Sequence, residues 1–166
     1  MNSRALGAAV AVAVFLADQA AKVAVLTNPP AAGQSLAPFL DLALRLNRGI
    51  SFSLFVQESA FGKGVLLALT LGATALLGWW LSRSRSTLVA IGLGSIIGGA
   101  LGNAADRILR GGVVDYLDLH AFGRHFFVFN LADAAINVGV ALLLVEVMFG
   151  SRGQSQVNKP ASPASR

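Results

Sequence analysis

The sequence predicts an all-α membrane protein, with four transmembrane helices and a small extracytoplasmic β-sheet that forms a cradle. Three observations support this fold class. The 166-residue chain is 55% hydrophobic and only 13% charged, whereas a soluble domain of this length carries more charge. Four apolar segments are each long enough to cross a hydrocarbon core, which takes about 20 helical residues. Two of the intervening segments alternate apolar and polar residues, as short strands do.

The composition excludes several classes of protein. The chain has no cysteine, which excludes thiol nucleophiles, cysteine-ligated zinc and disulfides. The net charge of +5 comes from basic residues spread over the termini and loops. This distribution favours anchoring to anionic membrane lipid over binding of nucleic acid. We expect a monomer without a cofactor.

We place the spans at residues 5–26, 63–81, 87–107 and 131–149 of a single domain covering residues 1–150. The N-terminus, the link between the second and third spans, and the tail together hold six basic residues and no acid. By the positive-inside rule, both termini should be cytoplasmic. The loops at 27–62 and 108–130 then lie on the outer side. The tail, residues 151–166, is rich in serine and proline and is expected to be disordered.

The first span carries two charges, Asp18 and Lys22, in its second half. They are four residues apart on one helix face and can neutralise each other, which lowers the cost of burial. Charges at this place argue against a cleaved signal peptide, although Arg4 precedes the apolar run. A structural ion pair is favoured here over a direct contact with substrate.

The first outer loop alternates as half-buried strands do. Apolar residues occupy every second position, at Leu40, Leu42, Leu44 and Leu46 and then at Ile50, Phe52 and Leu54. This period of two predicts two short strands joined around Asn47, Arg48 and Gly49. Their apolar face, beside the bilayer, could cradle an extended peptide or a lipid. Asn47 is equally well explained as a turn residue.

The second outer loop predicts two further strands, at 111–119 after a glycine turn and at 124–129. His120 and His125 lie in this loop, but two histidines without matched spacing are weak evidence for a metal site. A solvated or interfacial role is favoured, and no metal is expected. Neither histidine stands in a convincing relation to a serine nucleophile.

The third span has Gly94, Gly98 and Gly102 at intervals of four. Small residues at this interval let another helix approach closely in a membrane. Asn103 and Arg107 follow one turn apart, where this span reaches the outer surface. The glycine pattern lacks the spacing and the preceding strand of a nucleotide-binding loop.

Acidic residues are concentrated in one stretch, since four of the eight lie between Asp106 and Asp133. Carboxylates packed against membrane helices are costly to keep, which favours a functional role. We expect Asp115, near the start of a strand, to face Asp133, at the start of the fourth span. Asn130 and Asp133 also resemble a capping box. That explanation accounts for Asp133 but leaves Asp115 unexplained.

At this point the residues resemble the lipoprotein signal peptidases (signal peptidase II) over nearly all of residues 10–149. Four ordered blocks carry the resemblance: Asp18-Gln19 with Lys22; Asn47-x-Gly49-x-x-Phe52; Gly102-Asn103-x-x-Asp106-Arg107 continuing to Val113-Val114-Asp115-Tyr116; and Phe129-Asn130-x-Ala132-Asp133. Each block alone is weak evidence for the family, whereas four blocks in this order among four membrane spans are very specific evidence for it. The sequence departs from the family at Tyr116, where phenylalanine is frequent, and around Arg48.

The resemblance implies an aspartic endopeptidase of the bacterial cytoplasmic (inner) membrane. Such an enzyme removes the signal peptide from diacylglyceryl-modified prolipoproteins, just before the lipidated cysteine, at the outer face, and is inhibited by globomycin-type cyclic peptides. The family's outer loops form a sheet cradle and a short helix over the site. The catalytic pair falls on Asp115 and Asp133. Site-lining positions are Asn47, Gly49, Asn103, Arg107 and Asn130, and the supporting positions are Asp18, Lys22 and Asp106.

Two other functions fit part of the pattern. A small transporter or proton-relay subunit would also carry intramembrane acids, but at mid-membrane depth. A membrane scaffold would use the glycines for helix pairing, and neutralising the acids would leave its function intact. The clustering of the acids at one surface favours the peptidase.

Overall fold

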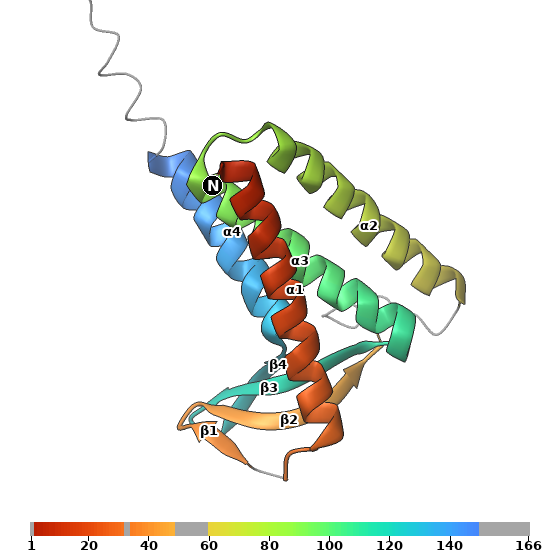
Figure 1. Ribbon diagram of the computed structural model, residues 1–166. Coiled ribbons are helices and arrows are strands. Elements are labelled where there is room, and N and C mark those ends of the chain that lie inside the picture. Colours follow the sequence, from red (N-terminus) through yellow and green to blue (C-terminus); the bar gives the residue numbers. More distant parts are fainter. Residues whose placement is uncertain (1, 32–33, 49–59, 150–166) are drawn as a thin grey trace, which may run out of the picture.

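The computed structural model describes residues 2–31, 34–48 and 60–149, without the side chains of Ala60 and Lys63. Within these residues, four helices are long and apolar enough to cross a membrane, and four strands form one antiparallel sheet. The helices are α1 (Ser3–Thr27), α2 (Ala60–Arg83), α3 (Thr87–Arg110) and α4 (Leu131–Phe149). Figure 1 shows one helical bundle with the sheet across its lower end. The predicted fold class is confirmed.

The helix ends have local causes in the sequence. The α3 helix begins after Ser86, whose hydroxyl accepts a hydrogen bond from the backbone N of Val89 at 3.3 Å. It ends at Arg110, and the residue after it, Gly111, has a φ of 73°, the left-handed conformation that glycine adopts most easily. This end lies beyond the predicted residue 107. The predicted strand at residues 50–54 and the tail at 151–166 fall outside the described residues.

The α3 helix forms the centre of the bundle. Ala90, Leu93 and Ile97 on this helix form a buried core with Leu81 of α2. The glycines of α3 let its neighbours come close. A Cβ atom at Gly98 would lie 2.5 Å from the backbone O of Ala11 on α1, and one at Gly99 would lie 2.5 Å from the backbone O of Ala132 on α4. Small residues therefore bring two helices against α3, as the spacing predicts.

The sheet has the strand order β1-β2-β3-β4. Its strands are β1 (Ser35–Ala37), β2 (Leu40–Asn47), β3 (Val113–Ala121) and β4 (Arg124–Phe129). The three longer strands occupy segments in which strands were predicted, whereas β1 was not predicted. Because β3 follows α3 and β4 precedes α4, the sheet is tied to the ends of two helices.

A register shift in β2 changes which side chains reach the site. Leu42 lies opposite Leu117, but Arg45 lies opposite Asp115, so β2 has one extra residue between these pairs. A bulge of this kind moves the following side chains to the other face. Arg45 and Asn47 therefore share the face of Asp115, and the last two leucines of the alternation lie on the opposite face. The prediction that all four leucines share one face is wrong.

Replacing Gly98 with alanine should destabilise the bundle, because the new methyl group would overlap the backbone of Ala11. Overpacking of this kind costs about 1–3 kcal/mol. Gly78→Ala is the matched control, since a Cβ at Gly78 meets nothing within 4 Å. Unfolding in mixed detergent micelles, followed by circular dichroism, measures the free energy of both variants. Equal stability of the two variants would contradict the close packing of α1 and α3.

Candidate active site

Asp115 and Asp133 lie in one site at the sheet end of the bundle. Asp115 belongs to β3 and is only 4% exposed, and Asp133 lies in the first turn of α4. Asn130 connects them. Its Nδ2 donates to Oδ1 of Asp115 at 2.7 Å, and its Oδ1 accepts from the backbone N of Asp133 at 3.0 Å. Two separate elements, a strand and a helix, thus deliver two carboxylates to the same place.

Asparagine amides hold both carboxylates in position. Asp115 accepts from Nδ2 of Asn47 at 3.1 Å as well as from Asn130. Oδ1 of Asp133 accepts from Nδ2 of Asn103 at 2.8 Å. Each carboxylate oxygen has two lone pairs, so an oxygen that accepts one amide can accept a further donor. The arrangement fixes the direction of the carboxylates and leaves them able to bind a water molecule.

The capping box predicted at the start of α4 is present. The side chain of Asn130 accepts from the backbone N of Asp133 at 3.0 Å, and Oδ2 of Asp133 accepts from the backbone N of Asn130 at 3.4 Å. This is the reciprocal pattern of a cap. The other oxygen of Asp133 faces Asn103. Capping thus orients Asp133 and still leaves an oxygen directed into the site.

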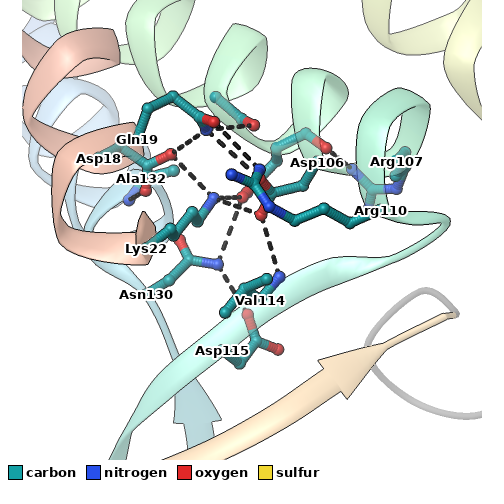
Figure 2. A network of polar contacts seen from close by, with 12 residues as sticks. Asp18, Gln19, Lys22, Asp106, Arg107, Arg110, Val114, Asp115, Asn130 and Ala132 are labelled. Carbon is teal, nitrogen blue, oxygen red and sulfur yellow. Dashed lines mark hydrogen bonds and ion pairs between the residues drawn. The ribbon is translucent and has the colours of Figure 1, made fainter. Parts of the chain in front are cut away.

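A fully buried lysine, Lys22, lies close to the site, and Figure 2 shows it among Asp18, Asp106 and Asn130. Nζ of Lys22 contacts Oδ2 of Asp18 at 2.8 Å, Oδ2 of Asp106 at 2.9 Å and Oδ1 of Asn103 at 3.0 Å. An ammonium has three N–H donors and no acceptor. Because Lys22 donates to the oxygen of the Asn103 amide, the nitrogen of that amide points to Asp133.

The two acids that bind Lys22 also attach to the elements carrying the site. Oδ1 of Asp18 accepts from the backbone N of Ala132, at the start of α4, at 3.0 Å. Oδ2 of Asp106 accepts from the backbone N of Val114, beside Asp115 on β3, at 3.0 Å. The ion cluster therefore joins α1 and α3 to both segments that carry a candidate catalytic acid (Figure 2).

Two residues make contacts at the site that were not found by sequence reasoning. Nη1 of Arg110 forms an ion pair with Asp106 and donates to Gln19. The hydroxyl of Tyr116 accepts from the backbone N of Leu131 at 3.2 Å, at the first residue of α4. The position of Arg110, one turn after Asp106, was a usable signal for the first contact. The sequence holds no signal for the second.

Arg107 lies at the edge of the site. Its Nη1 donates to the backbone O of Asn103 at 3.2 Å, and its charge interacts with those of Asp115 and Asp133. It lines a cavity of about 130 Å³ together with Arg48 and residues of α2. Gly49, the remaining predicted site-lining residue, lies outside the described residues.

The two carboxylates have different surroundings. Burial raises the pKa of Asp115 above its ordinary range, and the negative charge of Asp133 raises it further, while the amides of Asn47 and Asn130 oppose the shift. Asp133 has the backbone N–H of Asn130 and the N-terminus of a helix beside it, and both favour a negative charge. The surroundings of Asp115 therefore favour its protonated form, whereas Asp133 lies beside a helix N-terminus.

The histidines lie apart from this site, on the opposite face of the sheet. Nε2 of His120 lies 3.1 Å from Oδ1 of Asp41, and Nδ1 of His125 lies 2.9 Å from Oδ2 of Asp118. These pairs link β2 to β3 and β3 to β4. In the part of the chain that the structure describes, no three acidic or histidine side chains are grouped to hold a metal ion.

Asp115 should make the stability of the protein fall as the pH rises. Because its pKa is raised in the folded state, the folded protein holds this proton at a pH where the unfolded chain has lost it. The contribution of this proton to the stability of the folded state is therefore complete at a pH below the ordinary aspartate pKa. It is lost as the pH rises through the pKa of Asp115 in the folded protein. Asp115→Asn should flatten the dependence of melting temperature on pH between about pH 4 and about pH 8.

Asp41→Asn is the control on the same sheet. Although burial raises the pKa of Asp41, hydrogen bonds with Ser35 and His120 and the charges of His120 and His125 together lower it more, so its pKa lies below the ordinary range. Loss of Asp41 should therefore not flatten the profile. An unchanged profile for Asp115→Asn would show that Asp115 titrates normally in the folded protein.

Comparison with known proteins identifies the family. The family described as Signal peptidase (SPase) II, Peptidase_A8, matches residues 10–149. The lipoprotein signal peptidase of Methylocella silvestris is 48% identical over 159 residues, which cover 92% of this chain and 91% of that protein. That of a Methylobacterium species is 43% identical and covers 93% of this chain and 96% of that protein.

A solved structure of a membrane enzyme has the same fold. A bacterial membrane enzyme determined by the in meso method superposes with a TM-score of 0.73 at 25% identity, and the match covers 86% of this chain and 92% of that chain. With the family matched over almost the whole described chain and a relative at 48% identity, this protein belongs to the signal peptidase II family.

Proposed function

We propose that Asp115 and Asp133 are the catalytic pair of this signal peptidase II. We further propose that its substrates are prolipoproteins with diacylglycerol on the cysteine that follows the cleaved bond. One observation carries the assignment of the pair: β3 and α4 bring two carboxylates to the same asparagine, Asn130, at the sheet end of four membrane spans. Burying carboxylates against membrane helices costs free energy, so their presence there favours a functional role.

The pair should share one proton. Two neighbouring carboxylates cannot both ionise cheaply, so they titrate as a unit. Asp115 is the member expected to keep the proton, because burial and the charge of Asp133 raise its pKa. Asp133 is the member expected to be ionised, since the dipole of α4 stabilises an anion there by about 0.3–1 kcal/mol.

The reaction then needs one water molecule and no covalent intermediate. Asp133 takes a proton from the water, and the resulting hydroxide attacks the scissile carbonyl carbon. Asp115 donates its proton to the carbonyl oxygen, forming a neutral tetrahedral diol, and Asp133 then gives its proton to the leaving amine. When the carbon–nitrogen bond breaks, the proton of the diol returns to Asp115, and the pair is restored with one proton.

The sheet offers a surface for the substrate beside the pair. The side chains on the face of Asp115 are mostly apolar: Leu40, Leu42, Leu117, Leu119, Phe127 and Phe129. An extended peptide with apolar side chains fits such a surface. Asn47 and Arg107, at the edge of the site, are placed to contact its backbone.

The lipid of the substrate has a candidate position between the helices. A cavity of about 390 Å³ lies between α1, α2 and α3 and is lined almost entirely by apolar side chains, including Phe15, Leu71 and Ile108. Acyl chains that enter it would contribute about 0.8 kcal/mol per buried CH₂ group. The cavity adjoins the half of α3 that carries Asn103 and Arg107.

The orientation follows from the charge of the loops. The end of the bundle opposite the sheet holds Arg4, Arg83 and Arg85, so we place that end, with both termini, in the cytoplasm. The catalytic pair then lies at the outer face of the bacterial cytoplasmic membrane, where exported prolipoproteins arrive.

Asp115→Asn and Asp133→Asn should each lower the cleavage rate by at least about 10²–10⁴-fold, because each removes a proton-transfer group. Gel separation of precursor and mature lipoprotein measures the rate. Asp41→Asn, on the opposite face of the sheet, is the matched control and should cleave normally. Substantial cleavage by either active-site variant, with normal folding, would remove that residue from the pair. Proton flux into vesicles without proteolysis would favour the transporter instead.

A precursor without diacylglycerol should be cleaved far more slowly than the lipidated one, because it cannot bury acyl chains between the helices. Parallel assays on the two precursors measure this difference. A globomycin-type cyclic peptide should inhibit cleavage of the lipidated precursor, in keeping with the family. Equal rates on the two precursors would refute the proposed role of the lipid and leave the assignment of the catalytic pair standing.

A further inference from the structure

The end of the sheet remote from α3 carries two exposed phenylalanines. Phe39 lies in the turn between β1 and β2, and Phe122 lies in the turn between β3 and β4. The backbone N of His120 donates to the backbone O of Phe39 at 3.0 Å, so the turns are neighbours. Phe39 is 56% exposed, and Phe122, at 103%, is completely exposed. We call this pair the aromatic tip.

The backbone of Phe122 is also in a conformation that disfavours an aromatic residue. Its φ is 53°, and that of Gly123 is 72°. Tight hairpin turns that need two positive φ values prefer asparagine or aspartate followed by glycine. Phenylalanine here costs conformational energy and exposes a large apolar surface. A partner that removes this ring from water would offset both costs.

The position of the aromatic tip indicates which partner this is. The strand β3 begins just after α3 ends at Arg110, and β4 ends just before α4 begins at Leu131. The sheet therefore lies at the boundary of the membrane spans. Figure 1 shows its strands crossing the end of the bundle, with the β1–β2 turn projecting past the side of the helices. Strands that run across spanning helices run along the membrane surface, so the tip extends over lipid.

The residues near the aromatic tip have the composition of an interfacial surface. Leu36 and Phe126 are 55% and 59% exposed, and Arg124 beside the turn is exposed and cationic. Apolar rings with a neighbouring cation are typical of segments that lie at the boundary between acyl chains and anionic headgroups. Asp41, which is close to Phe39 in the sequence, is paired with His120.

We propose that the aromatic tip inserts into the lipid leaflet on the sheet side of the membrane. The four spans fix the bundle in the bilayer, and the tip adds a fifth contact, at the far end of the cradle. Because β3 carries both Asp115 and the turn with Phe122, this contact holds the site at a constant depth. The inference depends on the membrane spans and on the sheet, and it is independent of the catalytic assignment.

A single tryptophan at the aromatic tip tests this proposal. Trp79 and Trp80 are first replaced by phenylalanine, and Phe122→Trp is then introduced. The full chain is reconstituted into vesicles of phosphatidylcholine and phosphatidylglycerol, with or without bromine atoms on the upper acyl chains. We expect blue-shifted emission that brominated lipid quenches strongly and aqueous acrylamide quenches weakly. Leu69→Trp, on an exposed part of α2, is the embedded reference, and free N-acetyl-tryptophanamide is the aqueous reference.

Two results would overturn the proposal. Emission like that of the aqueous reference, quenched by acrylamide and unaffected by brominated lipid, would place the tip in water. Blue-shifted emission that neither agent quenches would place the tip against protein, such as a second copy of the chain. Phe39→Trp is a second probe of the same turn pair, for use if Phe122→Trp does not fold. Cleavage of a lipidated precursor and circular dichroism check that each tryptophan variant is native.

Discussion

The buried ammonium of Lys22 is the contact on which the rest of the site depends. It is fully removed from solvent, as are both carboxylates that it binds. Removing such ions from water costs several kcal/mol each, and only excellent geometry with further hydrogen bonds offsets this cost. Here the further bonds come from backbone N–H groups of α4 and β3. The same contacts that satisfy the charges therefore position the two segments that carry Asp115 and Asp133.

This arrangement also explains the last of the three glycines that α3 carries at intervals of four. A side chain at Gly102 would overlap the carboxylate of Asp18. The glycines at 94 and 98 bring α1 close enough for packing, and the one at 102 leaves room for the ion cluster. A single pattern of small residues thus serves helix association in one half of α3 and electrostatics in the other half.

Most of the fold could be predicted because apolar length and alternation are strong signals in a membrane protein. The four helices and three of the strands follow from them directly. The bulge in β2 could not be predicted, because the leucine alternation continues unbroken through it and only the pairing with β3 reveals the extra residue. The three-residue β1 is too short for its own periodicity to be detected.

The candidate site was predictable to a similar extent. Asn103, Asn130 and Asp133 come together because each lies at the same end of a span, a fact that the sequence contains. Their hydrogen bonds were not predictable, because an amide can present either its oxygen or its nitrogen. For Asn103, the orientation of the amide is set by Lys22, which donates to its oxygen and lies 81 residues earlier in the chain.

The capping box shows why a local explanation and a functional one need not compete. A cap requires Asp133 to accept from the backbone of Asn130, which uses one oxygen and holds the side chain in a single orientation. A catalytic base requires a carboxylate that is fixed in direction and has an oxygen directed into the site. The cap supplies the first requirement, and Asn103 at the other oxygen shows that the second is met.

Because the cap also places Asp133 in the positive field of the helix N-terminus, the local motif favours the charge state that the proposed base needs. Asp115, on a strand, has no such field, and burial together with the negative charge of Asp133 raises its pKa and favours the protonated state. The difference between a helix start and a buried strand therefore supports the opposite roles that we propose for these two identical side chains.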